Sequence, residues 1–183
     1  MTRPQLAAER VFLVGYRGCG KSTVGRVLAE RLGWEFVDTD DLVESRAGKS
    51  IAAIFADDGE AAFRDLEERL VGEASQRERT VVALGGGAVL RDATRRRLAA
   101  AGPVVWLMAP AAVLAERIAA DAGSASRRPS LTGLAGLEEV QRLLAEREPI
   151  YARCATARVD AAGEPPEALA DAILARLGGP GAA

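Results

Sequence analysis

The segment from Gly15 to Ser22, GYRGCGKS, carries residues that could bind the phosphates of a nucleotide. It matches the pattern G-x-x-x-x-G-K-[ST], whose glycines let backbone N–H groups point at phosphate oxygens. Lys21 would reach the β- and γ-phosphates, and the Ser22 hydroxyl would bind Mg²⁺. The chain has only two lysines, Lys21 and Lys49, so a lysine here indicates a need for a compact ammonium. The loop residues expected to contact ATP are Gly18, Cys19, Gly20, Lys21, Ser22 and Thr23.

Two carboxylates, Asp38 and Asp40, stand where the second expected strand ends. In open parallel sheets, ligands bind at the carboxyl ends of the strands. One carboxylate would hold Mg²⁺ through a water, and the other would accept or orient the proton of an attacking hydroxyl. The alternative is that these aspartates only cap the next helix. We prefer the functional interpretation for Asp38 and Asp40, and interpret Asp41 as a cap or a surface charge.

Short apolar runs alternate with amphipathic segments, and these elements must position the chemistry. Strands are expected at residues 10–15, 35–38, 80–84, 103–108 and 157–160. Helices are expected at residues 21–32, 41–47, 50–56, 60–76, 92–101, 137–152 and 165–177, with another starting at Pro110 and with Pro149 disturbing the last turn of its helix. This alternation predicts an α/β fold, a parallel sheet covered on both faces. Residues 123–136, rich in Gly, Ser and Arg, predict a mobile loop.

Length and composition limit the class of protein. The 183 residues fit one domain, 1–183, whose ends at residues 1–9 and 179–183 we expect to be flexible. A net charge of −2 argues against nucleic acid as a partner. Because the chain has no histidine, Ser-His-Asp hydrolases and His-zinc enzymes are excluded. The two cysteines are expected to be unpaired thiols in a reducing compartment.

A membrane partner is not expected from the sequence. No stretch approaches the ~18 apolar residues of a membrane span. Residues 1–9 also lack the apolar core that precedes the cleavage site of a signal peptide. The sequence therefore predicts a cytoplasmic protein.

Several separated motifs, in this order, resemble the shikimate kinase family, a branch of the P-loop proteins related to nucleoside-monophosphate kinases. The resemblance covers roughly residues 10–178. It rests on the phosphate loop, Asp38-Thr39-Asp40, Ser50-Ile51-Ala52 with Phe55, Phe63-Arg64 with Glu67, Leu84-Gly85-Gly86-Gly87, Arg128-Pro129, and Arg147 before Pro149-Ile150-Tyr151. The phosphate loop alone would be unspecific, whereas the ordered set is specific.

The resemblance implies a fold and a reaction. The expected fold is a three-layer α-β-α P-loop NTPase with a five-stranded parallel sheet in the order 2-3-1-4-5 and a mobile lid at about residues 123–136. The expected reaction transfers the γ-phosphate of ATP, with Mg²⁺, to the 3-hydroxyl of shikimate. Its products would be shikimate 3-phosphate and ADP, in aromatic amino-acid biosynthesis. The family also implies a monomer.

The resemblance further implies roles for single residues. Asp40 would bind the shikimate hydroxyls and is the candidate base, and Asp38 would hold a magnesium water. Arg64 and Arg147 would grip the shikimate carboxylate, with a backbone N–H from Gly86. The lid residue Arg128 would fold over ATP. The residues expected to act in catalysis are Lys21, Asp40 and Arg128.

The residue chemistry agrees with those roles. The planar guanidinium of arginine suits a carboxylate, because it can donate two parallel hydrogen bonds. Glu67, three residues after Arg64 on a helix, could hold that guanidinium in place. Phe55 and Phe63 could pack on the substrate ring or belong to the core, and both interpretations stay open. Arg117 is a candidate for stacking on adenine, although the length of the segment before Arg128 blurs its alignment.

Rival interpretations remain at this stage. The lid sequence is Arg-Pro-Ser-Leu, where many family members have Arg-Pro-Leu-Leu, so lid closure could differ. A kinase of the same fold could act on another alcohol, such as gluconate. A sensor could bind nucleotide or shikimate without transferring phosphate. An ATPase acting on partner proteins is a third alternative, which the short chain disfavours.

Overall fold

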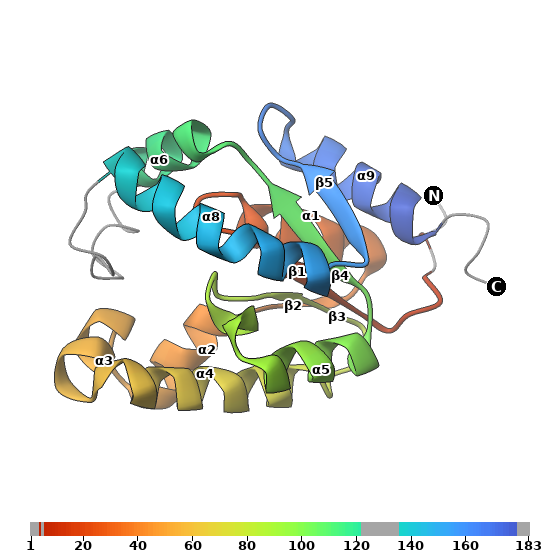
Figure 1. Cartoon of the computed structure of the whole chain (residues 1–183). Helices are drawn as coiled ribbons and strands as arrows, with labels where there is room; N and C mark the ends of the chain where they lie inside the picture. The colour runs from red at the N-terminus through yellow and green to blue at the C-terminus, as the bar shows by residue number, and fades with distance from the viewer. Residues whose placement is uncertain (1–3, 5, 122–135, 179–183) are drawn as a thin grey trace.

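Five short strands form one parallel sheet in the order β2-β3-β1-β4-β5 (Figure 1). The computed structural model describes residues 4, 6–121 and 136–178. The sheet order and the parallel direction predicted above are confirmed. The strands are β1 (Arg10–Val14), β2 (Glu35–Asp38), β3 (Thr80–Ala83), β4 (Val104–Met108) and β5 (Ala157–Asp160).

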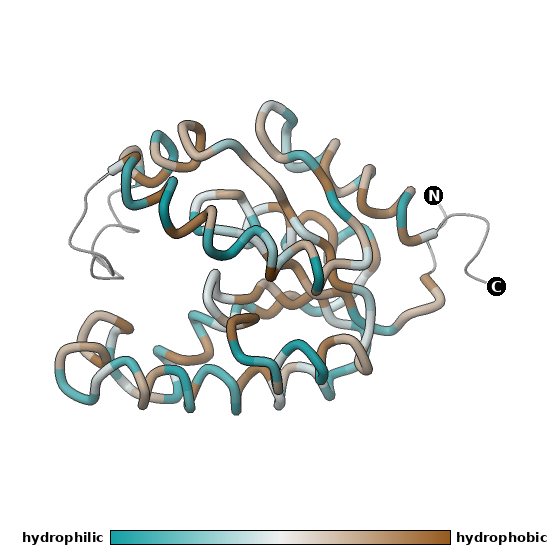
Figure 2. Tube along the Cα trace, in the orientation of Figure 1, coloured by the Kyte–Doolittle hydropathy of each residue, from teal (hydrophilic) through white to brown (hydrophobic). Residues whose placement is uncertain are grey.

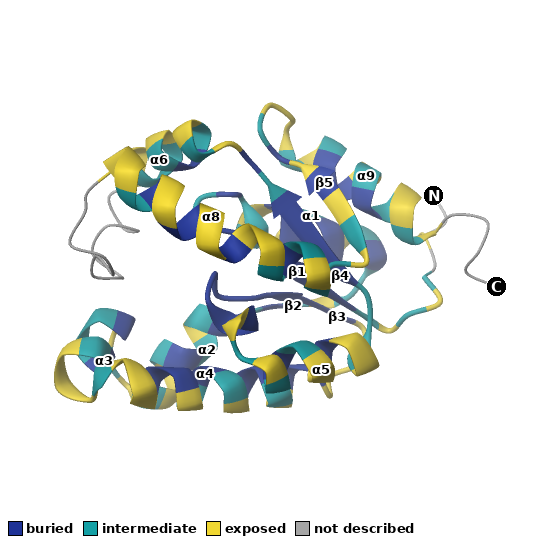
Figure 3. Ribbon diagram, in the orientation of Figure 1, coloured by how far each residue is buried: buried dark blue, intermediate teal, exposed yellow. Residues whose placement is uncertain are grey.

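The central strand β1 is buried on both faces, which explains its uninterrupted apolar sequence. It pairs with β3 on one side and with β4 on the other, where Phe12 is opposite Val82 and Val104. Because side chains alternate along a strand, Val11 and Leu13 point to one core and Phe12 to the other. Figure 3 shows the central strands β1, β3 and β4 mainly in the colour of buried residues, whereas the edge strand β5 also carries exposed residues.

Helices cover both faces of the sheet and present their apolar sides to it, as the hydropathy colours in Figure 2 show. Helices α1, α6 and α9 and the first half of α8 enclose one core, and α4, α5 and the end of α8 enclose the other. Helices α2 and α3 pack with α4 around a third, smaller cluster. The helices are α1 (Lys21–Leu32), α2 (Thr39–Ala47), α3 (Ile51–Asp57), α4 (Gly59–Ala74), the 3₁₀ turn η1 (Ala88–Leu90), α5 (Asp92–Ala101), α6 (Ala111–Ala120), α8 (Gly136–Cys154) and α9 (Pro166–Leu177).

Two helices differ from the prediction in ways that matter for the site. Helix α2 begins at Thr39 and not at Asp41, because the Asp38 side chain accepts a hydrogen bond from the Asp40 backbone N–H and so caps the helix. Helix α8 runs without a break through Pro149 to Cys154, where a disturbed last turn was expected.

Elements α1, α5, β2 and β5 agree with the prediction at both ends, and the remaining boundaries move by one or two residues. Of the expected lid, residues 123–135 lie outside the described residues, and Gly136 begins α8. In the described part of the chain, no helix combines the length and apolar character that crossing a membrane requires.

Candidate active site

The phosphate loop joins β1 to α1, and its glycines are needed for two reasons. Gly15, Gly18 and Gly20 have φ values of 143°, 83° and 94°, which L side chains rarely adopt. Gly15 also passes close to β4, where a Cβ atom would lie 2.5 Å from the carbonyl oxygen of Leu107. The loop therefore takes a curled path that only glycine allows at these positions, and it opens directly into the N-terminus of α1.

The ammonium of Lys21 lies over this loop. Its Nζ atom donates hydrogen bonds to the carbonyl oxygens of Gly15, at 2.9 Å, and of Tyr16, at 3.0 Å. It also lies 3.7 Å from Sγ of Cys19, a thiol that is 1% exposed. The charge is thus held where the loop and the helix N-terminus would hold phosphates. Cys19 contributes to the loop as a buried neighbour of Lys21.

Ser22 and Asp38 form the next part of the site. The Ser22 hydroxyl donates to Oδ2 of Asp38 at 2.6 Å, while Oδ1 of Asp38 accepts the N–H of Asp40 at 3.0 Å. Burial raises the pKa of the Asp38 carboxyl, the Ser22 bond works against this rise, and the charge of Asp40 adds to it. The capping and functional interpretations of Asp38 are therefore compatible, because its two oxygens face different partners.

A cavity of about 610 Å³ connects these groups. It contains the phosphate loop together with the carboxyl ends of β2 and β3, where Asp40 and Gly86 face the same space. Its walls include residues 17–24, Asp38, Asp40, Ile51, Leu84, Gly86, Arg117, Asp121, Ala161, Glu164, Pro166 and Leu169. Lys21, Ser22, Asp38 and Asp40, which are separated in the sequence, are thereby brought into one site.

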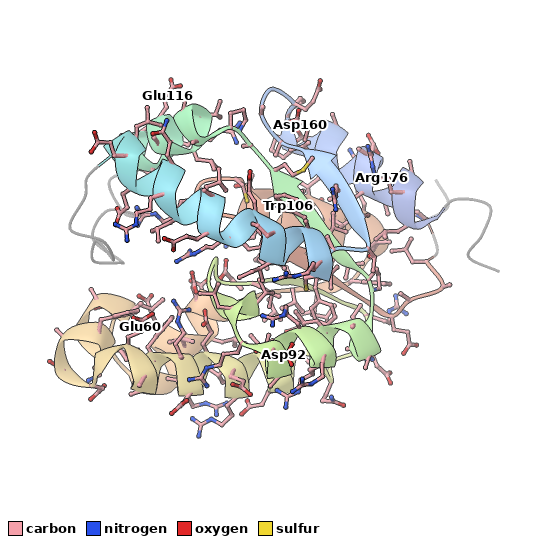
Figure 4. The ribbon with its side chains drawn as sticks, in the orientation of Figure 1. Glu60, Asp92, Trp106, Glu116, Asp160 and Arg176 are labelled. Atoms are coloured by element: carbon pink, nitrogen blue, oxygen red, sulfur yellow. The ribbon has the colours of Figure 1, made fainter. Side chains whose placement is uncertain are left out.

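Arg64 lies on α4 and is 8% exposed. Its Nη1 donates to Oε2 of Glu67 at 2.6 Å, which confirms the prediction that Glu67 holds this guanidinium. Nε and Nη2 lie 3.4 Å from Oε1 of Glu60, a residue labelled in Figure 4, and Cζ lies 5.0 Å from the ring centroid of Phe63. Phe63 is fully buried and stacks with Phe55 at 4.8 Å, so Phe63 belongs to the core.

Arg147 approaches from α8 and is 7% exposed. Its Cζ lies 5.5 Å from the ring centroid of Tyr16, and its Nη1 would be 3.7 Å from a Cβ placed on Gly86. Arg64 lies closer still to the next residue, because its Cζ would be 2.8 Å from a Cβ placed on Gly87. The two arginines are therefore neighbours of one glycine run, Gly85–Gly87, although neither lines the cavity itself.

The glycine run is held by two residues that the sequence analysis did not single out for this role. The Gly85 N–H donates to Oγ1 of buried Thr39 at 2.9 Å. The hydroxyl of Tyr151, on α8, donates to the Gly86 carbonyl, and its ring packs 5.8 Å from that of Trp106, which Figure 4 labels on β4. Burial raises the pKa of the Tyr151 hydroxyl, which keeps it a hydrogen-bond donor.

The structure shows the contacts of Arg117, which the sequence alignment could not establish. Its Nη2 donates to the carbonyl oxygens of Ala161, at 2.9 Å, and Ala162, at 3.0 Å, and its Nη1 reaches Gly18 at 3.5 Å. The side chain thus ties the phosphate loop to the segment after β5, on the wall of the cavity. Arg128 lies outside the described residues.

Comparison with known proteins identifies the family. A family model described as shikimate kinase matches residues 17–178, which is most of the chain. The chain belongs to the shikimate kinase family. The family assignment made from the ordered motifs is confirmed.

Individual family members agree over nearly the whole chain. A shikimate kinase of Rhodopirellula baltica is 48% identical over 160 residues, which are 87% of this chain and 86% of that protein. The structure of the shikimate kinase from Acinetobacter baumannii in complex with shikimate superposes with a TM-score of 0.86, at 35% identity, covering 92% of each chain.

A rival from the same fold is more distant. A gluconokinase from Sinorhizobium meliloti has a TM-score of 0.55 and 21% identity, covering 95% of this chain and 94% of the gluconokinase. That likeness shows a shared fold alone. The shikimate kinase family is therefore favoured over the gluconate alternative.

Proposed function

We propose that this chain transfers the γ-phosphate of ATP to the 3-hydroxyl of shikimate, giving shikimate 3-phosphate and ADP for aromatic amino-acid biosynthesis. One observation carries the proposal: a single cavity contains Lys21 and Ser22 of the phosphate loop, Asp40, and the backbone of Gly86. A phosphate donor and a hydroxyl acceptor can meet in such a space. Because phosphoryl transfer needs little covalent help from the protein, positioning and electrostatics supply most of the catalysis.

In this proposal the phosphate loop binds the phosphates of ATP and offsets their negative charge. Its N–H groups and the N-terminus of α1 hold the phosphates, and Lys21 stabilises the charge on the transferring group. Lys21 is already held at the loop by two carbonyl oxygens, so little rearrangement is needed. Arg128 is proposed to join Lys21 when the lid at residues 123–136 closes and excludes water, since an open site would hydrolyse ATP.

The acceptor is proposed to bind on the other side of Lys21. Arg64 and Arg147 would take the carboxylate of shikimate, and the Gly86 N–H would add a backbone donor. The charge of both arginines is nearly desolvated, which strengthens its pairing with an anion. Asp40 would orient the 3-hydroxyl toward the phosphate and accept its proton.

Mg²⁺ is proposed as the metal, and the residues fit it. The Ser22 hydroxyl and the Asp38 carboxylate are oxygen donors 2.6 Å apart at the phosphate loop, and hard cations prefer oxygen ligands. Ser22 would bind the ion directly and Asp38 through a water. When bound, Mg²⁺ would supply positive charge that offsets the negative charge of the phosphates. Burial raises the pKa of Asp38, and a nearby cation would favour its ionised form.

The reaction is tested by ADP release from Mg-ATP with shikimate, quinate or gluconate, using wild type and K21A. We expect release with shikimate only, and none from K21A. Turnover with gluconate and not shikimate would overturn the substrate. No turnover on any alcohol would overturn the transferase and favour a ligand sensor.

The metal has a separate test. With shikimate and ATP present, EDTA should abolish turnover and Mg²⁺ should restore it, and S22A should need a higher Mg²⁺ concentration than wild type. An S22A variant with an unchanged Mg²⁺ dependence would contradict the assignment of Ser22.

We also propose that the enzyme acts as a monomer in the cytoplasm. The monomer is what the resemblance to the shikimate kinase family implies. Cys19 and Cys154 are free thiols, which suits a reducing compartment. Light scattering of the purified protein and fractionation of source cells test the two statements, and a dimer or a membrane-bound pool would contradict them.

A further inference from the structure

Gly87, the third glycine of the run, is not required by its backbone conformation. Its φ of −105° and ψ of −2° are ordinary turn values that any residue can adopt. This separates Gly87 from Gly15, Gly18 and Gly20, whose positive φ values explain the choice of glycine. The reason for a glycine at position 87 must therefore lie in the space around it.

That space is filled by the guanidinium of Arg64. A Cβ atom on Gly87 would lie 2.7 Å from Nη2 and 2.8 Å from Cζ of Arg64, closer than real Cβ atoms approach other atoms. At Gly86, by contrast, a Cβ would make only ordinary contacts of 3.5 Å or more. The absence of a side chain at position 87 is thus what lets the end of the guanidinium that carries Nη1 and Nη2 lie against the glycine run.

Neither partner of this contact can easily move away. Arg64 is 8% exposed and is held by Glu67 at 2.6 Å and by the ring of Phe63. The glycine run is buried and is fixed through Gly85 by Thr39 and through Gly86 by Tyr151. The Gly87 carbonyl also accepts the N–H of Leu90 at 3.1 Å, so the backbone is held on both sides of Gly87. An added methyl group would therefore have to displace the guanidinium from its present place.

We propose that Gly87 is a positioning residue for the acceptor site, whose missing side chain sets the place and the orientation of Arg64 and thereby the selectivity for a carboxylated acceptor. The inference rests on the proposed function of Arg64 in binding the shikimate carboxylate. A planar guanidinium binds a carboxylate through two parallel hydrogen bonds, so a small displacement removes one of them. Gly87 itself need not touch the substrate.

The test is steady-state kinetics of G87A with shikimate and with ATP varied separately. We expect the KM for shikimate to rise at least tenfold and the KM for ATP to change less than twofold, because the phosphate loop is not touched. Unchanged KM values in a folded G87A variant would overturn the proposal.

A matched control lies on the same helix as Arg64. Gly72 also faces a guanidinium, since its Cβ would lie 2.7 Å from Nη1 of Arg97. Arg97 is exposed and can swing into solvent, and neither residue lines the cavity. G72A should therefore leave both KM values within twofold of wild type. An equal effect of G72A and G87A on shikimate would point to a general loss of structure and would overturn the proposal.

Introducing G87A into the R64K variant tests whether Gly87 acts through Arg64. A lysine ammonium is narrower than a guanidinium and does not need the cleared space. Adding G87A to R64K should raise the KM for shikimate less than threefold, against at least tenfold in wild type. Equal factors in the two backgrounds would show a role independent of Arg64 and overturn the proposal.

Folding and function are kept apart in the same experiment. If G87A does not fold, we expect R64K/G87A to fold, because the crowded guanidinium is gone; failure of the double variant to fold would contradict the proposal. If the wild type releases no ADP with shikimate, the proposed function is wrong. If the wild type is active and G87A has an unchanged KM for shikimate, only the inference about Gly87 is wrong.

Discussion

Replacing Arg64 by alanine perturbs a buried ion pair and the acceptor site at once. The guanidinium lies 2.6 Å from Oε2 of Glu67, and the Glu67 side chain is 3% exposed, so R64A would take a charged partner away from a desolvated carboxylate. Removing one partner of a buried pair costs roughly 3–5 kcal/mol. E67A should cost less, because Arg64 keeps Glu60 at 3.4 Å. Glu60 is 58% exposed, so that pair contributes only about 0–1 kcal/mol.

The double variant R64A/E67A supplies the decisive comparison. With both charges removed, no buried carboxylate lacks its arginine, so the double variant should be more stable than R64A alone. The coupling free energy should then be about 2 kcal/mol or more. Urea denaturation of wild type, both single variants and the double variant measures it. Additive losses would refute the reasoning, because they would show that Glu67 does not hold Arg64.

The same variants have kinetic consequences. Truncating one partner of a charged contact costs about 2–5 kcal/mol, which corresponds to a rise of roughly 30-fold to several thousand-fold in the KM for shikimate for R64A. E67A should raise this KM by a smaller factor, since the guanidinium stays but loses its fixed position. In both variants the KM for ATP should stay close to that of wild type, which is the internal control.

Three further predictions concern other parts of the molecule. Y151F removes the donor to the glycine run, which should lower the free energy of unfolding by about 1–2 kcal/mol and raise the KM for shikimate; an unchanged KM would contradict the positioning role. G15A should lower the free energy of unfolding by about 2–6 kcal/mol, because the new Cβ would collide with the Leu107 carbonyl oxygen. G48A, which has open space around it, should lower it by only about 1–2 kcal/mol. Equal losses for the two variants in urea denaturation would contradict this reasoning. Burial raises the pKa of the Cys154 thiol, so at pH 8 iodoacetamide should alkylate it more slowly than a free cysteine, with the rate rising above pH 9; mass spectrometry showing the free-thiol rate would contradict this.

Much of the fold could be predicted, because the periodicity of apolar residues and the glycines at the ends of helices indicate the same elements. Helix α1 starts after Gly20 and stops at Gly33, whose φ of 68° needs a glycine, so both of its ends are marked in the sequence. The strand order is not a local property. It followed from the family resemblance, since no pattern in β3 alone states that it pairs with both β1 and β2.

The errors in the helices have local causes. The sequence allowed Asp38, Asp40 or Asp41 as the cap of α2, and only the three-dimensional contact of Asp38 with the Asp40 N–H distinguishes them. Pro149 was expected to disturb its helix because proline lacks an N–H group. The helix continues because Tyr151, two residues later, is fully buried against the sheet and anchors the chain beyond the proline.

The candidate site shows the same division. The placement of Lys21 and Ser22 could be predicted from the phosphate-loop motif, and that of Asp38 from its position at the end of a strand. The role of Thr39 and of Tyr151 could not, because each supports a glycine that is distant in the sequence, Gly85 or Gly86. Such contacts depend on the packing of α8 and β2 around the end of β3.

The most direct test of the account is the identity of the product that the wild-type enzyme makes from Mg-ATP and shikimate. Phosphorus and proton NMR of the reaction mixture would show which oxygen carries the phosphate. The account predicts one phosphate ester, on the 3-hydroxyl, formed in equal amount to ADP. Inorganic phosphate without an ester, or an ester on another hydroxyl, would contradict the way Asp40, the glycine run and the phosphate loop have been assembled into one site.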